Sequence, residues 1–175
     1  MKHPTLIFAV ALAVPMLVVS TAQATAPNDA QIAAIVVVAN QVDVDAGKLA
    51  ETKASNADVK AFAQRMASDH TGVNKQATEL VTRLKVTPEN NPTSESLKAD
   101  GDKNIERLKK LSGAEFDKAY IDHEIAYHEQ VLDAVDKTLI PNARNEELKA
   151  LLVSVRPAFI SHAEYARQVR SLLGK

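Results

Sequence analysis

The stretch SGAEFDKAYIDHEIAYHEQVLDAVDKTL, residues 112–139, decides the fold of this chain. Its apolar residues recur every three or four positions, which is the period of an α-helix with one buried face. Ser112 to Glu115 has the sequence of a capping box, and Pro141 and Asn142 follow the last apolar residues. We therefore predict one long helix that begins near Ser112 and ends near Leu139.

The same apolar period recurs in three further segments, at residues 28–54, at 57–84 and from 143–146 almost to the C-terminus. Ser55 and Asn56 separate the first two segments and offer a helix cap. Pro157 lies inside the last segment, on the face opposite its apolar stripe, where we expect it to kink the helix toward water.

A long crossover joins the two pairs of helices. It runs from Lys85 to Ser112 and contains a shorter amphipathic pattern that Gly101 interrupts. Two tight hairpins connected in this way predict an all-α protein, a ferritin-like four-helix bundle whose crossover contains a short helix. An up-and-down bundle with a decorated middle loop is the alternative.

The chain opens with MKHPTLIFAVALAVPMLVVSTAQA, residues 1–24, in which a short basic region precedes an apolar run. This run is shorter than the roughly 20 residues that a membrane-spanning helix needs, and it ends at the small-x-small triplet Ala22-Gln23-Ala24. The sequence therefore predicts a signal peptide over residues 1–24 and one domain over residues 25–175 without a transmembrane span. It also predicts a periplasmic or secreted location.

Charge and composition argue against several classes of partner. The chain has 21 Lys and Arg against 22 Asp and Glu, a net charge of −1, whereas nucleic-acid binding requires a basic face. We therefore expect no nucleic-acid partner. The chain has no cysteine, so packing alone must hold the fold in an oxidising compartment. No nucleophile–base arrangement or Gly-rich phosphate loop indicates a hydrolase or a nucleotide-binding protein.

Each of the four long helices carries ionisable residues on its apolar face. On the helix quoted above, a wheel of about 100° per residue puts Glu124 near the middle of the buried half and His128 well inside it. Asp117 also lies inside, and His123 lies at the edge. The other helices contribute Asp43, Asp69, His70 and His162, with Asp69 at the border of its face. Counting from the tight turns at about 1.5 Å per residue places the innermost groups near mid-bundle.

Ionisable groups buried in this way need a cation, a proton or hydrogen-bond partners, because an unpaired buried charge costs several kcal/mol. Carboxylate oxygens and imidazole nitrogens form a ligand set suited to Fe, Zn, Mn or Cu. The candidate metal ligands are Asp43, Asp69, His70, Glu124, His128 and His162. Two alternatives stay open. Asp–His and Glu–His hydrogen bonds could fix the helix register without an ion, or the groups could be partly exposed to solvent.

Several segments resemble an uncharacterised family of exported bacterial proteins. The resemblance is carried by DVKAFAQRMASDH at 58–70, GKLA at 47–50, LSGAEFDKAY at 111–120, and Arg156-Pro157 with His162. Proteins of that family contain a ferritin-like domain of unknown function and are often labelled outer-membrane proteins. The resemblance implies an exported ferritin-like bundle over nearly all of residues 25–175, and no established activity.

The sequence departs from ferritin-like enzymes at the residues that matter for iron. Di-iron members use Glu-x-x-His, whereas the residues three before the four later histidines are Ala67, Tyr120, Ile125 and Phe159. Relatives in the resembled family often have Asp-His on the third long helix, where this chain has Tyr127-His128. Glu124 stands one turn away as a replacement oxygen ligand.

Three functions fit these features. The first is a non-enzymatic protein, associated with the cell envelope and acting in stress tolerance, whose inward cluster binds a divalent metal or forms a polar core. The second is a metal-dependent oxidoreductase of the ferroxidase type. The third is a helical interaction module, because Val37, Val38 and Val44 exceed what the core face of the first helix needs. An exposed strip of this kind favours a homodimer or a partner helix.

Overall fold

The computed structural model describes residues 26–174, which form helices and connecting turns without a strand. In chain order the elements are α1 (Asp29–Lys53), α2 (Ala57–Leu84), α3 (Pro92–Lys109), α4 (Gly113–Ala134), the π-helical turn η1 (Val135–Leu139), α5 (Ile140–Asn142) and α6 (Glu146–Leu172). The protein is all-α, as the sequence predicts. The expected signal peptide at residues 1–24 lies outside the described residues.

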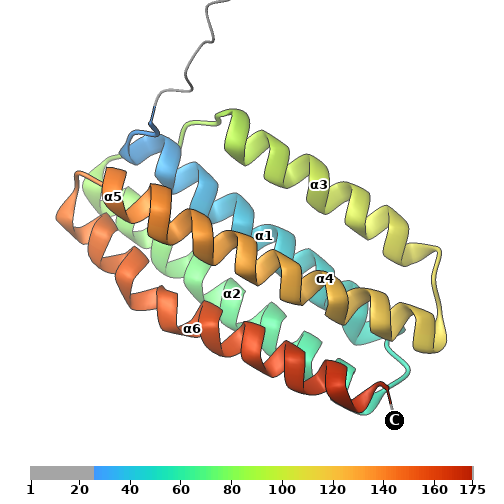
Figure 1. Cartoon of the computed structure of the whole chain (residues 1–175). Helices are drawn as coiled ribbons and strands as arrows, with labels where there is room; N and C mark the ends of the chain where they lie inside the picture. Colours follow the sequence, from blue (N-terminus) through green and yellow to red (C-terminus); the bar gives the residue numbers. More distant parts are fainter. Residues whose placement is uncertain (1–25, 175) are drawn as a thin grey trace, which may run out of the picture.

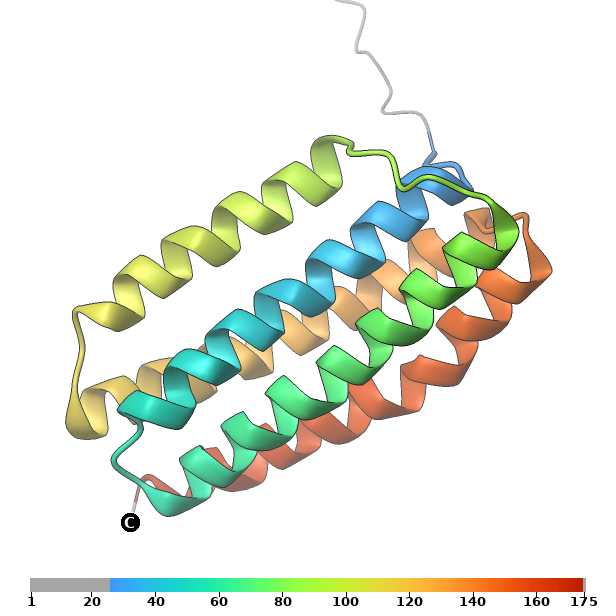
Figure 2. The ribbon, with the colours of Figure 1, turned by 180° about the vertical axis from the view of Figure 1, so that it is seen from behind.

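Four long helices pack lengthwise, and α3 lies outside them against α1 (Figures 1 and 2). α1 packs on α2, α4 packs on α6, and contacts of α2 with α6 and of α1 with α4 join the two pairs. The Glu89 N–H donates to the Ala30 carbonyl (3.0 Å) at one end of α1, and Lys53 Nζ donates to the Lys109 carbonyl (2.6 Å) at the other. The crossover therefore runs the whole length of α1.

Asparagine side chains start most of these helices, because their oxygen accepts from the unpaired N–H groups of a first turn. The cap residues are Asn28, Asn56, Asn91 and Asn145. α4 begins differently, since Ser112 occupies the cap position but its hydroxyl makes no cap hydrogen bond. The predicted capping box from Ser112 to Glu115 is wrong, because Gly113 has a left-handed φ of 57° that breaks the geometry of the box.

The helix that begins at Gly113 continues past its predicted end at Leu139. Val135–Leu139 form a π-helical turn, in which the Ile140 N–H donates to the Val135 carbonyl five residues earlier. Pro141 then lies inside α5. Because Pro141 has no N–H to donate, the wider turn lets the helix continue through it to Asn142.

α3 covers the valine-rich side of α1. A Cβ added to Gly101 of α3 would lie 2.7 Å from Val42 Cγ2, so a glycine is needed there for the two helices to approach. Val44 is buried, and Val37 and Val38 are half-buried between α1 and α3. The predicted exposed strip of these three valines is therefore wrong, because Val44 is buried and the crossover helix of the same chain packs beside Val37 and Val38.

Gly47 and Gly72 have contrasting surroundings, and substitutions at the two positions should have opposite effects. A Cβ on Gly47 would lie 2.9 Å from the Ala63 carbonyl oxygen of α2, whereas a Cβ on Gly72 would meet nothing within 4 Å. We expect Gly47→Ala to destabilise the protein by about 1–3 kcal/mol through overpacking. Gly72→Ala should stabilise it by about 0.5–1 kcal/mol, because alanine favours the helix and restricts the unfolded chain. Urea unfolding compares the two variants, and effects of the same sign would contradict close packing of α1 on α2.

Candidate metal centre

A layer of buried polar groups divides the core into two apolar clusters. On α1 the first cluster extends to Val42 and the second begins at Ala46, with Asp43 between them. Near the same boundary on the other three long helices lie His70, Glu124, His128 and His162. We call Asp43, His70, Glu124, His128 and His162 the polar layer. The layer crosses the core at one height, which agrees with the depth predicted by counting from the turns.

The groups of the polar layer are sealed from solvent, since each of the five residues is at most 2% exposed. Partial exposure, one of the alternatives, is therefore excluded. Asp69 is different, because its side chain is 41% exposed and lies at the edge of the layer. Its Oδ2 is 2.9 Å from His162 Nε2. The structure thus brings five of the six predicted ligands together and places the sixth behind one of them.

Asp117 is buried, as the helical wheel predicts, but it lies away from the polar layer. Its carboxylate accepts hydrogen bonds from the Ser55 N–H (3.0 Å), the Asn56 N–H (2.9 Å) and the Ser55 hydroxyl. These bonds tie the start of α4 to the turn between α1 and α2. The role of Asp117 is therefore structural.

The hydrogen bonds of His128 and His162 determine which of their ring nitrogens carry protons. His128 Nδ1 lies 2.9 Å from the Glu124 carbonyl oxygen, and His162 Nε2 lies 2.9 Å from the Asp69 carboxylate. Both partners can only accept a hydrogen bond, so these two nitrogens carry the protons. In the neutral form of each ring the opposite nitrogen, His128 Nε2 or His162 Nδ1, carries a lone pair.

Asn40 determines which ring nitrogen of His70 carries a proton. Asn40 Nδ2 donates to the Val36 carbonyl (2.8 Å), which turns Asn40 Oδ1 toward His70 Nδ1 at 2.7 Å. The amide oxygen accepts, so His70 Nδ1 carries the proton and His70 Nε2 keeps a lone pair. Each of the three histidines is thus oriented by an acceptor that leaves one nitrogen free.

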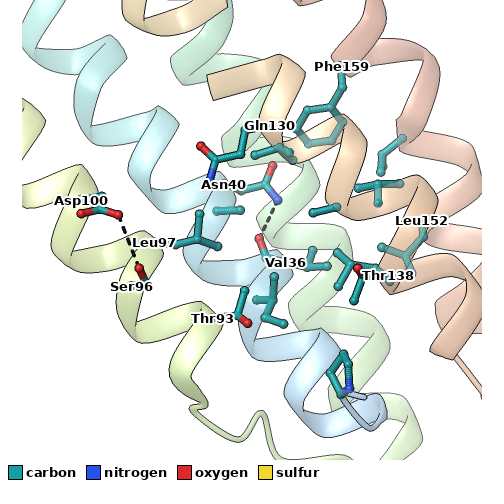
Figure 3. A pocket seen from close by; sticks show the side chains of 18 of the residues that line it. Val36, Asn40, Thr93, Ser96, Leu97, Asp100, Gln130, Thr138, Leu152 and Phe159 are labelled. Atoms are coloured by element: carbon teal, nitrogen blue, oxygen red, sulfur yellow. Dashed lines mark hydrogen bonds between the residues drawn. The ribbon is translucent and has the colours of Figure 1, made fainter. Parts of the chain in front are cut away.

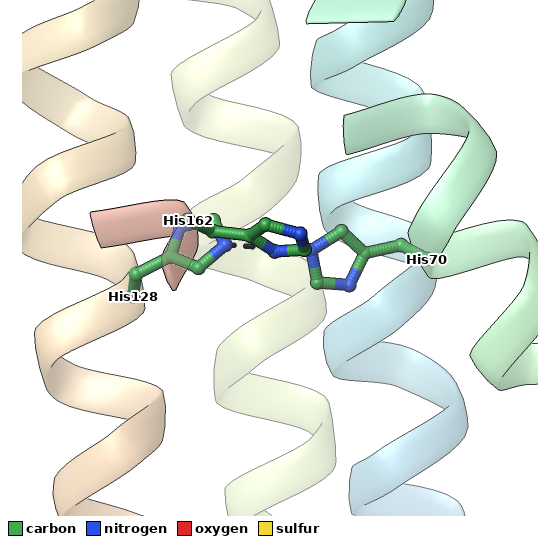
Figure 4. Close-up of side chains that lie close together, drawn as sticks. All are labelled: His70, His128 and His162. Atoms are coloured by element: carbon green, nitrogen blue, oxygen red, sulfur yellow. Dashed lines mark hydrogen bonds between the residues drawn. The ribbon is translucent and has the colours of Figure 1, made fainter. Parts of the chain in front are cut away.

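The rings of His70, His128 and His162 converge (Figure 4), and the carboxyl groups of Asp43 and Glu124 lie close to His128. His70 Nε2 lies 3.3 Å from His128 Nε2 and 3.3 Å from Asp43 Oδ2. One potential ligand atom from each of His70, His128 and His162 lies within 4.8 Å of the other two, and His128 forms a second such group with Asp43 and Glu124. Lone pairs and a carboxylate at this range repel one another in a low-dielectric core, so a cation or a proton is required between them.

Hydrogen bonding inside the layer does not satisfy these groups. Both carboxyl oxygens of Asp43, both of Glu124, and His162 Nδ1 are buried and have no hydrogen-bond partner among the described residues. Buried polar atoms in folded proteins are nearly always paired. Of the Asp–His and Glu–His hydrogen bonds considered from the sequence, the His162–Asp69 bond is formed at the edge of the layer. His70 and His128 direct their Nδ1 protons to Asn40 and to the Glu124 carbonyl, so these protons do not satisfy the carboxyl groups of Asp43 and Glu124.

Burial and neighbouring charges distribute the protons of the two carboxyl groups unequally. Burial raises the pKa of Glu124 well above its usual value, and the Asp43 carboxylate raises it further. Burial also acts to raise the pKa of Asp43, but His70, His128 and Glu124 together leave that pKa below its usual value. Asp43 is therefore ionised beside a protonated Glu124. Burial lowers the pKa of His70, which keeps that ring neutral.

The resulting donor set consists of three imidazole nitrogens and one carboxylate, with a second carboxyl group beside them. Such N and O ligands suit Zn, Fe, Mn and Cu. Histidine ligands of metals almost always donate their other N–H to a carboxylate or a carbonyl, as these three rings do. The residues present therefore fit a divalent transition metal.

Three residues of the site were not singled out from the sequence. Asn40 orients His70, and the Tyr127 hydroxyl donates to the Ala39 carbonyl (2.9 Å) beside the layer. The Phe159 ring packs on His70 and His128, with ring centroids 5.4 and 5.8 Å apart. Asn40 lies three residues before Asp43 on the same helical face, and this spacing was the available signal. Tyr127 and Phe159 fit the apolar pattern and carried no separate signal.

Comparison with known proteins places the chain in a family. The model of a domain of unknown function, DUF4142, matches residues 15–169. The chain belongs to the DUF4142 family. No curated protein and no solved structure matches the chain. The function of this DUF4142 protein must therefore be argued from its site. Among residues 26–174, none of the helices combines the length and the apolarity that a membrane span requires.

The polar layer should make the stability of this DUF4142 protein depend on pH. Burial lowers the pKa of His162 from 6.5 to about 4, although the bond to Asp69 opposes the shift. Between these values the unfolded chain binds a proton that the folded protein does not, so stability falls as pH falls. We expect His162 to account for a loss of about 2 kcal/mol between pH 7 and about pH 5 in metal-free protein.

The matched variant for this test is His162→Gln, measured by urea unfolding at both pH values. Glu124 acts in the opposite direction, since its raised pKa favours the folded state as pH falls. That contribution is common to both proteins and cancels in the comparison. An equal loss of stability in the wild type and the variant would contradict the neutral buried state of His162.

Proposed function

We propose that this protein is an exported, periplasmic protein with a ferritin-like bundle that binds one divalent metal ion through His70, His128, His162 and Asp43. One observation carries the proposal. His128 belongs to two groups of potential ligand atoms, one with His70 and His162 and one with Asp43 and Glu124, and all five residues are sealed from water. A proton is the competing occupant, and the protonated Glu124 carboxyl beside Asp43 carries one that a metal ion would have to displace.

Glu124 completes the proposed site. A dication near Asp43 would stabilise the ionised form of the Glu124 carboxyl and so lower its raised pKa. Glu124 would then lose its proton and add a second carboxylate, which would balance the charge of the ion. Metal binding should therefore release a proton, because the ligands must be deprotonated.

The direction of the helices supports a ferritin-like topology. The Arg144 and Asn145 N–H groups donate to the Asp29 carboxylate, so α6 begins beside the start of α1. Asp117, in the second turn of α4, accepts a hydrogen bond from the Ser55 N–H just after the end of α1, so α4 begins at that end of the bundle. α1 and α6 therefore run one way and α2 and α4 run the other, with the crossover between the hairpins. A bundle with one long crossover of this kind is the ferritin-like arrangement.

We assign the protein a non-enzymatic role in holding metal in the cell envelope, which fits a function in stress tolerance. The polar layer is closed to solvent and supplies its ligands from the protein. The chain also lacks the Glu-x-x-His pairs from which ferritin-like di-iron sites are built. The pattern of residues 1–24 supports export, and N-terminal sequencing of protein from fractionated cells should begin at Thr25.

Metal analysis of the purified protein lacking residues 1–24 tests the proposal. We expect one transition-metal ion per chain after exposure to Zn, Fe, Mn and Cu followed by removal of unbound metal. Two iron atoms per chain with consumption of oxygen would instead support a ferroxidase. Folded protein that retains no metal would leave the layer as a polar core.

A further inference from the structure

A pocket opens beside the polar layer, between α1, α3 and the end of α4 (Figure 3). Its volume is about 430 Å³, and most of its lining is apolar. Small-molecule sites in proteins typically measure about 300–1,000 Å³ and combine an apolar wall with a few polar groups. The pocket has the size and character of such a site.

The π-helical turn forms part of the wall. η1 contributes Val135, Thr138 and Leu139 to the lining. π-helical turns are rare and are frequently found at functional sites. This feature is independent of the pocket volume, since it concerns the hydrogen bonding of the backbone.

The inner wall of the pocket is also the outer wall of the polar layer. Asn40 and Phe159 both line the pocket. Asn40 accepts from His70, while the Phe159 ring packs on His70 and His128. A molecule in the pocket would therefore touch the two side chains that position these histidines.

The charge of the lining limits what can bind. Among residues 26–174, no Lys, Arg or His lines the pocket, and the only charged residue in the lining is Asp100, which lies 2.9 Å from Lys103 Nζ. An anionic ligand would lose its hydration without gaining a cationic partner. Asn40, Gln130 and Thr138 supply polar atoms for hydrogen bonds. The lining therefore suits a neutral molecule with an apolar body and a hydrogen-bonding group.

We propose that this pocket binds a neutral, mainly apolar small molecule, whose polar group lies against Asn40. The binding itself needs no metal. Its influence on the histidines rests on the proposed function, because a ligand that moves Asn40 or Phe159 would alter the environment of a bound ion through His70.

The fluorescent amine N-phenyl-1-naphthylamine is a neutral probe for the test, applied to metal-free protein lacking residues 1–24. We expect saturable binding of one probe per chain with a micromolar Kd. The anionic probe 1-anilinonaphthalene-8-sulfonate should bind at least about tenfold more weakly, because the lining has no cation.

Variants locate the bound probe. Ala134→Trp fills the pocket from α4 and should weaken binding of the neutral probe by at least about tenfold. Leu172→Trp, at an exposed position outside the pocket, is the matched control and should leave the Kd unchanged. Thr138→Trp repeats the test from an exposed position of η1 if Ala134→Trp does not fold. Absent binding, preference for the anionic probe, or equal binding by the pocket variants and the control would overturn the proposal.

The Co(II)-loaded protein tests the coupling separately. Addition of the neutral probe should shift the visible absorption of bound Co(II) in the wild type and not in Ala134→Trp. Failure of Co(II) to bind would count against the proposed function alone, because the metal-free fluorescence measurement stands by itself. Binding of the probe without a shift in the Co(II) spectrum would overturn the coupling.

Discussion

Replacement of His128 by glutamine is expected to weaken Zn(II) binding by more than about 100-fold, because loss even of a group that orients a ligand costs about 10–100-fold. His128 belongs to both groups of converging ligand atoms, and its Nε2 lies 3.3 Å from that of His70. A glutamine cannot present a nitrogen lone pair at that position. Competition with a chromophoric chelator measures the affinity, and circular dichroism checks the fold.

His123→Gln is the matched control on the same helix. His123 is half-buried at the edge of the layer and stacks on Tyr127 with ring centroids 5.7 Å apart. It belongs to neither group of converging ligand atoms. The control should bind Zn(II) like the wild type. Equal affinities of the two variants would show that the ion, if bound, is held elsewhere.

Replacement of Asp117 by alanine should lower the free energy of unfolding by about 2–4 kcal/mol, since it removes a buried carboxyl group that accepts three hydrogen bonds from Ser55 and Asn56. Asp117 is buried and receives both N–H bonds of the turn that precedes α2. For a domain of this size the loss corresponds to a fall in Tm of about 5–15 °C. Thermal unfolding followed by circular dichroism measures it.

Asp122→Ala is the control for this second variant. Asp122 lies on the same helix but is exposed, and its partner Arg170 lies at 2.5 Å. Exposed ion pairs contribute about 0–1 kcal/mol, so the control should unfold within a few degrees of the wild type. Both variants should bind Zn(II) normally, because neither carboxylate belongs to the polar layer. A stable Asp117→Ala protein would refute the anchoring role.

The boundaries of α1 and α2 could be predicted because the sequence marks them locally. Asn28 and Asn56 are strong cap residues, and the apolar stripes between the breaks are long. The capping at the start of α4 could not be predicted from the sequence, because the predicted capping box at Ser112 is broken by the left-handed backbone angle of Gly113. The π-helical turn before Pro141 likewise results from hydrogen bonding that residue patterns do not reveal.

The height of the polar layer was predictable for a geometric reason. The helices are long and the turns between partners are short, so counting residues from a turn fixes the depth of His70 or Glu124. The side on which the crossover lies is not encoded in any one helix. For that reason Val37 and Val38 were predicted to be exposed, whereas α3 covers them.

The helical wheel also could not distinguish a buried carboxyl group that accepts hydrogen bonds from one that has no donor. Asp117 and Glu124 both face inward on α4, but only Asp117 meets backbone donors, which come from a turn far away in the sequence. The oxygens of Glu124 meet no donor among the described residues. The chemistry of such a group depends on tertiary partners, and helical periodicity contains no information about them.

The most direct test of metal binding by the polar layer is a crystal structure of the protein lacking residues 1–24, grown with Zn(II) and measured at the zinc absorption edge. We expect an anomalous peak between the free nitrogens of His70, His128 and His162 and the carboxylate of Asp43. An ordered polar layer without that peak, with the imidazoles joined to the carboxylates by protons or water, would contradict it.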